Sequence, residues 1–533
     1  MPSEPRRSPR KPHLIRRPVR AAALAAASLL AVPALAACGS DAKAPARAKP
    51  SGQATATAPA PLPALPAALT GQKPAWRTCP APSAAQGGGK APGAAWECAS
   101  MKAPLDYAKP AGETIDVALI RKKATDPGKR IGSLVYNFGG PGGSGVHTLP
   151  QAADEYKKLG AVYDLVSFDP RGVGNSAPVV CLDDKTLDED PGSGNTLDDI
   201  KKFTDACKQK SAKLLPHVGT VDTARDMDLM RQVLGDQKLN YFGISYGTRL
   251  GGVYAHLFPK NVGRTVFDAV VDPTTDEAQA GLGQAKGFQL ALEHAMEYCR
   301  SKYTANCPTG PSDAEGNKRI NEMLEKLKAK PAATDSGRKL TSDLALTGIA
   351  ASLYDKEAWE YLVQGLGELR QLGTGNLLLL LADSYNGRGE DGRYDNSNAA
   401  QAAINCVDTS RRYTVEEKTA QEAAFRAASP VFGPEMVEGL LGCSQWPVRG
   451  TADKPQVSAE GAAPIVVIGN TGDPATPVEG AKRMADSLGR GVGVNLTVKG
   501  EGHGTYGKNS CATKAVDAFL VDGTAPADGT QCS

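Results

Sequence analysis

The stretch that most constrains this 533-residue chain is Gly243-Ile244-Ser245-Tyr246-Gly247, a Gly-x-Ser-x-Gly pattern. Apolar and aromatic residues precede it, and a segment of helical character follows it. This arrangement is typical of a sharp strand-to-helix turn that lifts a serine hydroxyl above a sheet. A side chain at position 243 or 247 would collide with neighbouring backbone where the turn is tightest. Because so short a pattern often occurs by chance, it predicts a nucleophile only if catalytic partners accompany it.

Apolar runs that predict strands alternate with helical patterns on both sides of Ser245. The strands are expected at residues 115–120, 131–138, 163–168, 239–244, 266–271, 464–469 and 494–498. A helix is expected to end near Leu234, with Asp222 or Thr223 as its N-terminal cap. Strands that alternate with helices predict an α/β fold with a mostly parallel sheet.

A nucleophilic serine needs a base that takes its proton and an acid that orients the base. Of the six histidines, only His503 lies in a glycine-bounded loop directly after a late strand. Asp473 follows the preceding strand in a loop that Pro474 and Pro477 stiffen. The order Ser245, Asp473, His503 is that of the α/β-hydrolase triad. The alternatives are a structural role for the histidine and a turn or cap role for the aspartate.

An oxyanion hole needs two backbone N–H groups that point at the developing negative charge. One is expected from Tyr246, the residue after the nucleophile. The other is expected from the Gly-Gly-Pro-Gly-Gly-Ser-Gly loop that begins at Gly139. Pro141 has no N–H, so Gly140 is favoured over Gly139 and Gly142. The loop lacks the Lys-Ser/Thr ending of a nucleotide-binding loop, and no cofactor is expected.

Five motifs occur in one order along the chain. They are Gly-Gly-Pro-Gly-Gly-Ser-Gly at 139–145, Asp-Pro-Arg-Gly-x-Gly-x-Ser at 169–176, Gly-Ile-Ser-Tyr-Gly-Thr at 243–248, Gly-Asp-Pro-x-Thr-Pro at 472–477 and Gly-His-Gly at 502–504. Over about residues 95–515 the chain thereby resembles the prolyl and tripeptidyl aminopeptidases of the α/β-hydrolase superfamily, above all the secreted actinomycete enzymes. The resemblance implies an exopeptidase that releases short peptides from free N-termini. Asp169 and Arg171 are expected to have structural roles.

Residues 274–460 have a different character from the rest of the chain. Helical patterns dominate there, at 280–300, 314–328, 356–369 and 415–428, and no strand run of the earlier kind is apparent. We expect a helical cap inserted between two parts of an α/β-hydrolase core, residues 76–273 and 461–533. The family resemblance implies that the cap supplies carboxylates for the substrate's α-amino group. Asp276, Glu277 and Asp408 are candidates, and a solvated surface role is the alternative for each.

The N-terminal 37 residues predict export. They carry seven Lys or Arg and one acid, which leaves 54 basic and 57 acidic residues in the remainder, a net charge of −3. Charge therefore gives no reason to expect nucleic-acid binding. A basic region up to Arg20 precedes an apolar run, residues 21–37, which is short for a membrane span. This three-part form predicts a signal peptide, and Arg16-Arg17 leaves twin-arginine export open.

The segment Leu35-Ala36-Ala37-Cys38-Gly39 resembles a bacterial lipobox. In that interpretation Cys38 is lipidated and becomes the mature N-terminus. The alternative is an ordinary signal peptide cut near Ala37. Residues 38–75 are rich in Ala and Pro, which predicts a tether that holds the globular part away from a membrane surface.

Ten further cysteines imply disulfides, because their number is even and the chain carries an export signal. The simplest hypothesis pairs neighbours in sequence order: 79–98, 181–207, 299–307, 406–443 and 511–532. There is no Cys-x-x-Cys pair, so a zinc site is not expected.

The sequence thus predicts an exported or surface-anchored serine exopeptidase whose partners are the free N-termini of peptides or proteins. The first alternative is a secreted esterase or lipase with the same triad, because substrate class is not written in the triad. The second is a surface-anchored binding lipoprotein that has kept the fold without activity.

Overall fold

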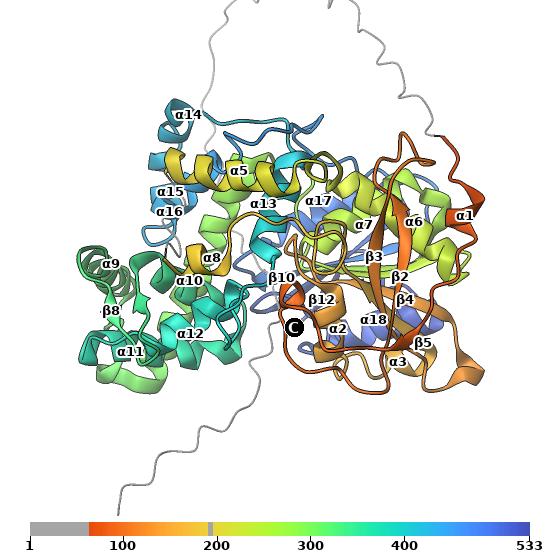
Figure 1. Ribbon diagram of the computed structural model, residues 1–533. Coiled ribbons are helices and arrows are strands. Elements are labelled where there is room, and N and C mark those ends of the chain that lie inside the picture. Colours follow the sequence, from red (N-terminus) through yellow and green to blue (C-terminus); the bar gives the residue numbers. More distant parts are fainter. Residues whose placement is uncertain (1–62, 190–195) are drawn as a thin grey trace, which may run out of the picture.

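A computed structural model describes residues 63–189 and 196–533 of the chain. Figure 1 shows a twisted sheet on one side of the molecule and a group of helices on the other. The predicted signal peptide, the lipobox with Cys38 and most of the tether lie outside the described residues. Within the described ranges, no helix is both long and apolar enough to cross a membrane.

The sheet has ten strands, in the spatial order β1-β2-β3-β5-β4-β6-β7-β10-β11-β12. In chain order these are β1 (Arg77–Thr78), β2 (Glu97–Pro104), β3 (Thr114–Lys122), β4 (Gly132–Asn137), β5 (Tyr163–Phe168), β6 (Leu239–Ile244), β7 (Val262–Asp268), β10 (Ile465–Gly472), β11 (Gly493–Glu501) and β12 (Thr530–Cys532). Pairing from β5 onwards is parallel, and β1, β2 and β3 join by antiparallel pairing. The predicted α/β fold with a mostly parallel sheet is confirmed.

Helices cover both faces of the sheet (Figure 1). One face packs against α6 (Thr220–Leu234), α7 (Tyr246–Leu257) and α17 (Glu479–Leu488), and the other against α2 (Gly145–Ala152), α3 (Leu159–Val162) and α18 (Ser510–Asp517). A short helix, α1 (Ala67–Thr70), precedes the sheet, and its Leu69 is buried in the same apolar core as α6. The prediction that the tether extends to residue 75 was therefore wrong, because its last part packs on the sheet domain. Alternate strand residues enter opposite cores: Val135 and Tyr241 lie in the first, and Tyr136 and Phe242 in the second. Because both faces are covered, the central strands are apolar runs rather than alternating patterns.

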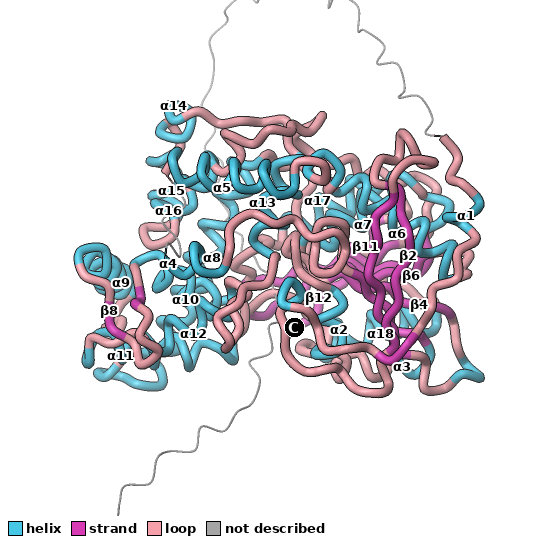
Figure 2. Tube along the Cα trace, in the orientation of Figure 1, coloured by secondary structure: helices cyan, strands magenta, loops and turns pink. Residues whose placement is uncertain are grey.

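A helical region lies between β7 and β10, and Figure 2 shows it almost free of strands. Its helices are α8 (Glu277–Tyr303), α9 (Asp313–Ala329), α10 (Ser342–Leu353), α11 (Trp359–Leu372), α12 (Asn376–Tyr385), α13 (Ser397–Asp408), α14 (Val415–Thr419), α15 (Glu422–Ala428) and α16 (Gly433–Met436). It has its own apolar core, which includes Leu292, Leu344 and Leu378. The region also contains a pair of antiparallel strands that was not predicted, β8 (Ala332–Ala333) and β9 (Lys339–Leu340), each of two residues.

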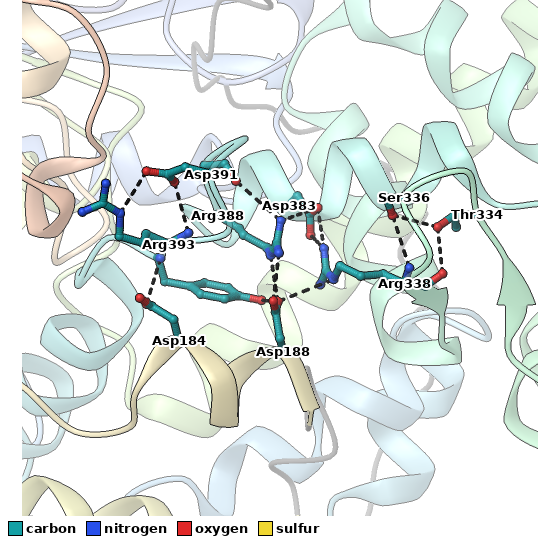
Figure 3. A network of polar contacts seen from close by, with 11 residues as sticks. Asp184, Asp188, Thr334, Ser336, Arg338, Asp383, Arg388, Asp391 and Arg393 are labelled. Atoms are coloured by element: carbon teal, nitrogen blue, oxygen red, sulfur yellow. Dashed lines mark hydrogen bonds and ion pairs between the residues drawn. The ribbon is translucent and has the colours of Figure 1, made fainter.

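Two helices that precede Ser245 in sequence pack on this region. Ile200 of α5 (Leu197–Ser211) shares an apolar cluster with Phe425 and Leu440. Asp188 of α4 (Asp184–Glu189) accepts two hydrogen bonds from Arg388, at 2.7 and 2.8 Å, in the polar network drawn in Figure 3. Helices α4 and α5 therefore help to hold the helical region against the rest of the molecule.

Three predicted boundaries were wrong. Helix α6 begins at Thr220, not at Asp222 or Thr223, because the distant Asp408 carboxylate accepts the Thr220 N–H at 2.8 Å and serves as the cap. Strand β7 spans Val262–Asp268 rather than 266–271, since Ala269 takes a left-handed conformation (φ 62°). The helix expected at 415–428 is broken into α14 and α15.

All five predicted disulfides form in the structure. They join Cys79 to Cys98, Cys181 to Cys207, Cys299 to Cys307, Cys406 to Cys443 and Cys511 to Cys532. Each bridge closes a short loop, with between 8 and 37 residues of sequence separation. The bridge from Cys406 fastens α13 to the chain that leads back into the sheet.

The turn after β5 is built around two buried charged side chains, as expected. Arg171 has no exposed surface and donates five hydrogen bonds: two to Asp226, at 2.7 Å each, and three to main-chain carbonyls. Asp169 accepts from Ser144 at 2.6 Å and from the Asn175 N–H at 3.0 Å. The turn is thereby joined both to α6 and to the loop that starts at Gly139.

We expect Arg171→Lys to destabilise the fold by about 3 kcal/mol. Lysine keeps the charge but cannot form the paired contact with Asp226 or reach the three carbonyls, and a broken buried pair typically costs this much. The midpoint of urea unfolding, measured with disulfides intact, tests the expectation. Arg393→Lys is the matched control, because its pair with Asp391 is exposed and should contribute less than about 1 kcal/mol. Equal midpoints for the two variants would contradict this account.

Candidate active site

Ser245 occupies the tight turn between β6 and α7. Its backbone lies at φ 57° and ψ −127°, a region that non-glycine residues rarely adopt. A Cβ at Gly243 would lie 2.5 Å from the Gly247 carbonyl oxygen, and one at Gly247 would lie 2.4 Å from the Asn137 carbonyl oxygen. The steric role predicted for both glycines is confirmed. The Ser245 N–H donates to the Asp268 carbonyl at 3.2 Å, which ties the turn to the end of β7.

The glycine-rich loop that begins at Gly139 lies directly against the serine. A Cβ at Gly139 would lie 2.8 Å from the Ser245 Cβ and 3.1 Å from the Tyr246 nitrogen. The Gly139 N–H is taken by Asn137 Oδ1 at 3.1 Å, whereas that of Gly140 has no acceptor among the described residues. Tyr246 is the first residue of α7, so its N–H has no intrahelical acceptor. The two residues whose N–H groups lack an acceptor, Gly140 and Tyr246, line the same cavity as Ser245.

Asp473 and His503 meet at the C-terminal ends of β10 and β11. His503 Nδ1 lies 3.2 Å from Asp473 Oδ1. The aspartate is completely buried, and its Oδ1 also accepts the N–H groups of Ala475 and Thr476 at 2.6 Å each. Burial raises the pKa of Asp473, and the charge and hydrogen bond of His503 act in the opposite direction. With Nδ1–H directed at the aspartate, Nε2 is the ring nitrogen that remains to act as a base.

A second buried carboxylate, Asp268, fixes the histidine loop. Its Oδ2 accepts the N–H groups of Thr505 and Tyr506 at 2.7 and 3.1 Å, while its carbonyl accepts the Ser245 N–H. Burial raises the pKa of Asp268. Sequence analysis did not single out this residue. The one signal in the sequence was its position, an acidic residue at the end of the strand that follows the Ser245 strand along the chain.

The helical region covers the histidine directly. The His503 N–H donates to the Tyr354 carbonyl at 3.0 Å, and the Tyr354 ring stands edge-on to the imidazole with 5.2 Å between centroids. Phe288 and Tyr385 pack on Tyr354, at 5.7 and 5.8 Å between ring centroids. This aromatic wall excludes water from one side of the proposed base.

One cavity of about 1500 Å³ joins these groups to the helical region. Ser245, His503, Gly140 and Tyr246 all line it. Its opposite walls come from α8, from α13 and from the segment around Glu435. The cavity is large enough for a short peptide, since typical ligand pockets measure about 300–1,000 Å³.

The three candidate carboxylates for an amino group differ in their surroundings. Asp408 is engaged by Thr220 and lies 3.3 Å from Arg249, and Asp276 caps α8 by accepting the Gln279 N–H at 2.9 Å. Glu277 lines the cavity, and its buried Oε2 has no hydrogen-bond partner among the described residues.

Burial raises the pKa of Glu277 to about 7, and the nearby Arg412 charge lowers it only in part. Arg412 donates instead to main-chain carbonyls, including that of Cys406 at 2.9 Å. A carboxylate that is partly desolvated and lacks a paired cation is poised to accept one from a ligand. Of the three candidates, Glu277 is therefore the one free to bind an amino group.

Comparison with known proteins gives concordant matches along the chain. Residues 133–302 match the family described as "alpha/beta hydrolase fold", and residues 429–532 match "TAP-like protein". Serine protease Hip1 of Mycobacterium tuberculosis is 38% identical over 475 residues, 83% of this chain and 88% of that protein. Carboxylesterase B of M. tuberculosis is 32% identical over 455 residues, 82% of this chain and 86% of the other.

Tripeptidyl aminopeptidase of Streptomyces lividans is 30% identical over 454 residues, 82% of this chain and 83% of that protein. The chain therefore belongs to the α/β-hydrolase family of serine hydrolases that includes Hip1 and the actinomycete tripeptidyl aminopeptidases.

Proposed function

We propose that this chain is a serine exopeptidase that releases short peptides, tripeptides above all, from free N-termini. Ser245 is the nucleophile, His503 the general base and acid, and Asp473 the group that orients the imidazole and stabilises its protonated form. The observation that carries the proposal is a single cavity that contains both the Ser245–His503 end and the unpaired carboxylate of Glu277. That combination binds a chain terminus and cleaves a bond a fixed distance from it.

The reaction follows from the positions of these groups. His503 takes the Ser245 hydroxyl proton as the oxygen attacks the scissile carbonyl. The N–H groups of Tyr246 and Gly140 stabilise the oxyanion. His503 then gives the proton to the leaving amine, whose C–N bond breaks to leave an acyl-serine. A water molecule, deprotonated by His503, attacks the ester, and His503 returns that proton to the Ser245 oxygen as the acyl C–O bond breaks and the peptide is released.

The length of α8 supports a product of a few residues. A Cβ at Gly287 would lie 2.6 Å from the Asp473 carbonyl oxygen, so this point of α8 rests on the acid loop. Glu277 lies ten residues earlier, about 15 Å along the helix. Three residues of extended peptide span about 10 Å. The Glu277 side chain can span the remaining distance of about 5 Å between these two lengths.

An esterase is the second candidate function, because the relative named Carboxylesterase B is as similar as the aminopeptidase. Both activities use the same triad and oxyanion hole. They differ in whether a charged amino group contributes to binding. Comparison of free and N-acetylated substrates therefore decides between them.

We also propose export and lipid anchoring through Cys38, with residues 1–37 as the signal peptide and a tether that begins at Cys38 and ends before the packed helix α1. Five disulfides support an oxidising compartment. The division into core residues 76–273 and 461–533 with a cap at 274–460 belongs to the same proposal. The packing of α4 and α5 on the helical region favours counting both helices with the cap.

Ser245→Ala should lower kcat/KM for a free tripeptide anilide by about 10⁴- to 10⁶-fold, because the nucleophile is lost while binding remains. Anilide hydrolysis and labelling by a fluorophosphonate probe provide the measurements. An unchanged circular dichroism spectrum and unfolding midpoint establish that the fold is intact. Retention of substantial hydrolysis would refute Ser245 as the nucleophile. Failure of the wild-type protein to label would favour the binding lipoprotein.

Glu277→Gln should lower kcat/KM for the free tripeptide anilide by about 10- to 100-fold, mainly through KM. This corresponds to the loss of one charge-assisted contact of about 1.5–3 kcal/mol. Hydrolysis of p-nitrophenyl acetate should be unchanged. Glu479→Gln is the control, since Glu479 lines the same cavity at an exposed position and the change in net charge is identical. An equal effect of both substitutions would argue against a specific ammonium site.

The KM for free tripeptides should rise as the pH falls through about 7. Because the pKa of Glu277 is raised, its carboxyl is charged above that pH and neutral below it, so attraction for the substrate ammonium is lost on the acid side. The ratio of KM for free and N-acetylated tripeptide anilides removes the contribution of the catalytic histidine, and it is measured between pH 5 and about 7, where the substrate's own α-amino group is mostly protonated. In Glu277→Gln this ratio should no longer change with pH. A wild-type ratio that is flat with pH would exclude Glu277.

A further inference from the structure

We propose that the side-chain amides of Gln401 and Asn405, on α13, form a subsite that binds the main chain of the substrate between the oxyanion hole and Glu277. The proposal rests on the proposed exopeptidase function and concerns how the same cavity recognises peptide bonds. Its ligand is the backbone of an extended peptide, whatever side chains the peptide carries.

The position of α13 is fixed at both ends by contacts with the catalytic face. At its start, a Cβ at Gly142 would lie only 2.3 Å from the Ser397 carbonyl oxygen and 3.0 Å from the Gln401 nitrogen. At its end, Asp408 accepts the Thr220 N–H and pairs with Arg249, one turn beyond the nucleophile. The helix therefore begins against the glycine-rich loop at Gly139 and ends beside the first turns of α6 and α7.

The far end of α13 leads toward Glu277. Arg412 donates to the Cys406 carbonyl in the last turn of α13, and the charge of Arg412 acts on the Glu277 carboxyl. A peptide that extends from the oxyanion hole to Glu277 crosses a cavity that this helix lines. The Cys406–Cys443 disulfide fastens the same turn.

One face of α13 presents polar side chains to the cavity. Asn398, Gln401 and Asn405 recur at helical spacing and line the cavity, whereas Ala403 and Ile404 are buried. Asn398 already donates weakly to the Asn386 carbonyl, at 3.5 Å. Within residues 63–189 and 196–533, the amides of Gln401 and Asn405 have no hydrogen-bond partner. Each amide offers two donor hydrogens and an acceptor oxygen, as a ligand that carries both N–H and C=O groups requires.

The spacing of the two amides fits an extended peptide. Asn405 follows Gln401 by four positions, which places the two residues about 6 Å apart along the helix axis. An extended chain advances about 3.3 Å per residue, so its polar groups on one edge recur about every 6.6 Å. The two amides therefore match alternate peptide units. A small ester without peptide units makes no use of them.

The test compares two substrates on four proteins. The proteins are the wild type, Gln401→Ala, Asn405→Ala and the control Gln364→Ala, which removes an exposed helical amide of α11 outside the cavity. The substrates are a free tripeptide anilide and p-nitrophenyl acetate. We expect each cavity variant to lower kcat/KM for the anilide about tenfold while acetate hydrolysis and the control variant stay within twofold of wild type. Equal losses on both substrates would mean that the oxyanion loop had moved, and would overturn the subsite.

A modified substrate gives a second, independent readout. In this depsipeptide an ester replaces the peptide bond between the first two residues of the same tripeptide anilide, which removes one N–H. We expect the wild type to lose several-fold in kcat/KM on this change and the more affected of the two variants to lose less, so that the two changes are not additive. Fully additive effects would overturn the subsite.

Failure of this subsite differs from failure of the proposed function. If the wild type cleaves free tripeptides in a Glu277-dependent way but neither alanine variant changes the anilide rate, only the subsite is refuted. If the wild type hydrolyses p-nitrophenyl acetate and leaves free tripeptides intact, the exopeptidase function and the subsite are refuted together.

Discussion

The hydrogen bonds of Asp268 hold together the two loops on which the proposed chemistry depends. Its carbonyl oxygen accepts the Ser245 N–H, and its buried carboxylate accepts the N–H groups of Thr505 and Tyr506, just beyond His503. One residue at the end of β7 thereby fixes the serine turn of β6 and the histidine loop of β11. Asp473 orients the imidazole ring, whereas Asp268 sets where the loop stands. The strained backbone of Ser245 persists because its surroundings are held in this way.

The helical region and the sheet domain are joined by hydrogen bonds that each part supplies to the other. Asp408 of α13 supplies the cap that α6 lacks in its own sequence, and Tyr354 holds the main chain of His503. At the outer edge, Asp188 pairs with Arg388 while Arg338 pairs with Asp383, as Figure 3 shows. Because catalytic loops and helix termini use groups from the helical region, displacement of that region would disturb the site itself.

Features set by local sequence were predictable, and features set by distant contacts were not. The order of Ser245, Asp473 and His503 could be read because each follows a recognisable strand, and the disulfides because each joins neighbouring cysteines. The start of α6 could not be read, since its cap comes from Asp408, 188 residues away. The role of Asp268 depends on which strands are neighbours in space. The packing of α5 on the helical region is likewise invisible in a local pattern.

Selection for a free N-terminus follows from the cost of an unpaired buried charge. The Glu277 carboxylate is partly desolvated and its Oε2 has no hydrogen-bond partner among the described residues, because the two terminal nitrogens of the nearby Arg412 donate to main-chain carbonyls instead. An ammonium group that enters the cavity removes this penalty, whereas an acylated terminus leaves the carboxylate buried without a partner. A site built around a polar group discriminates strongly against ligands that lack the matching group. In the proposed function, the same residue attracts a free N-terminus and disfavours internal segments of a chain, and the distance along α8 sets which bond is cleaved.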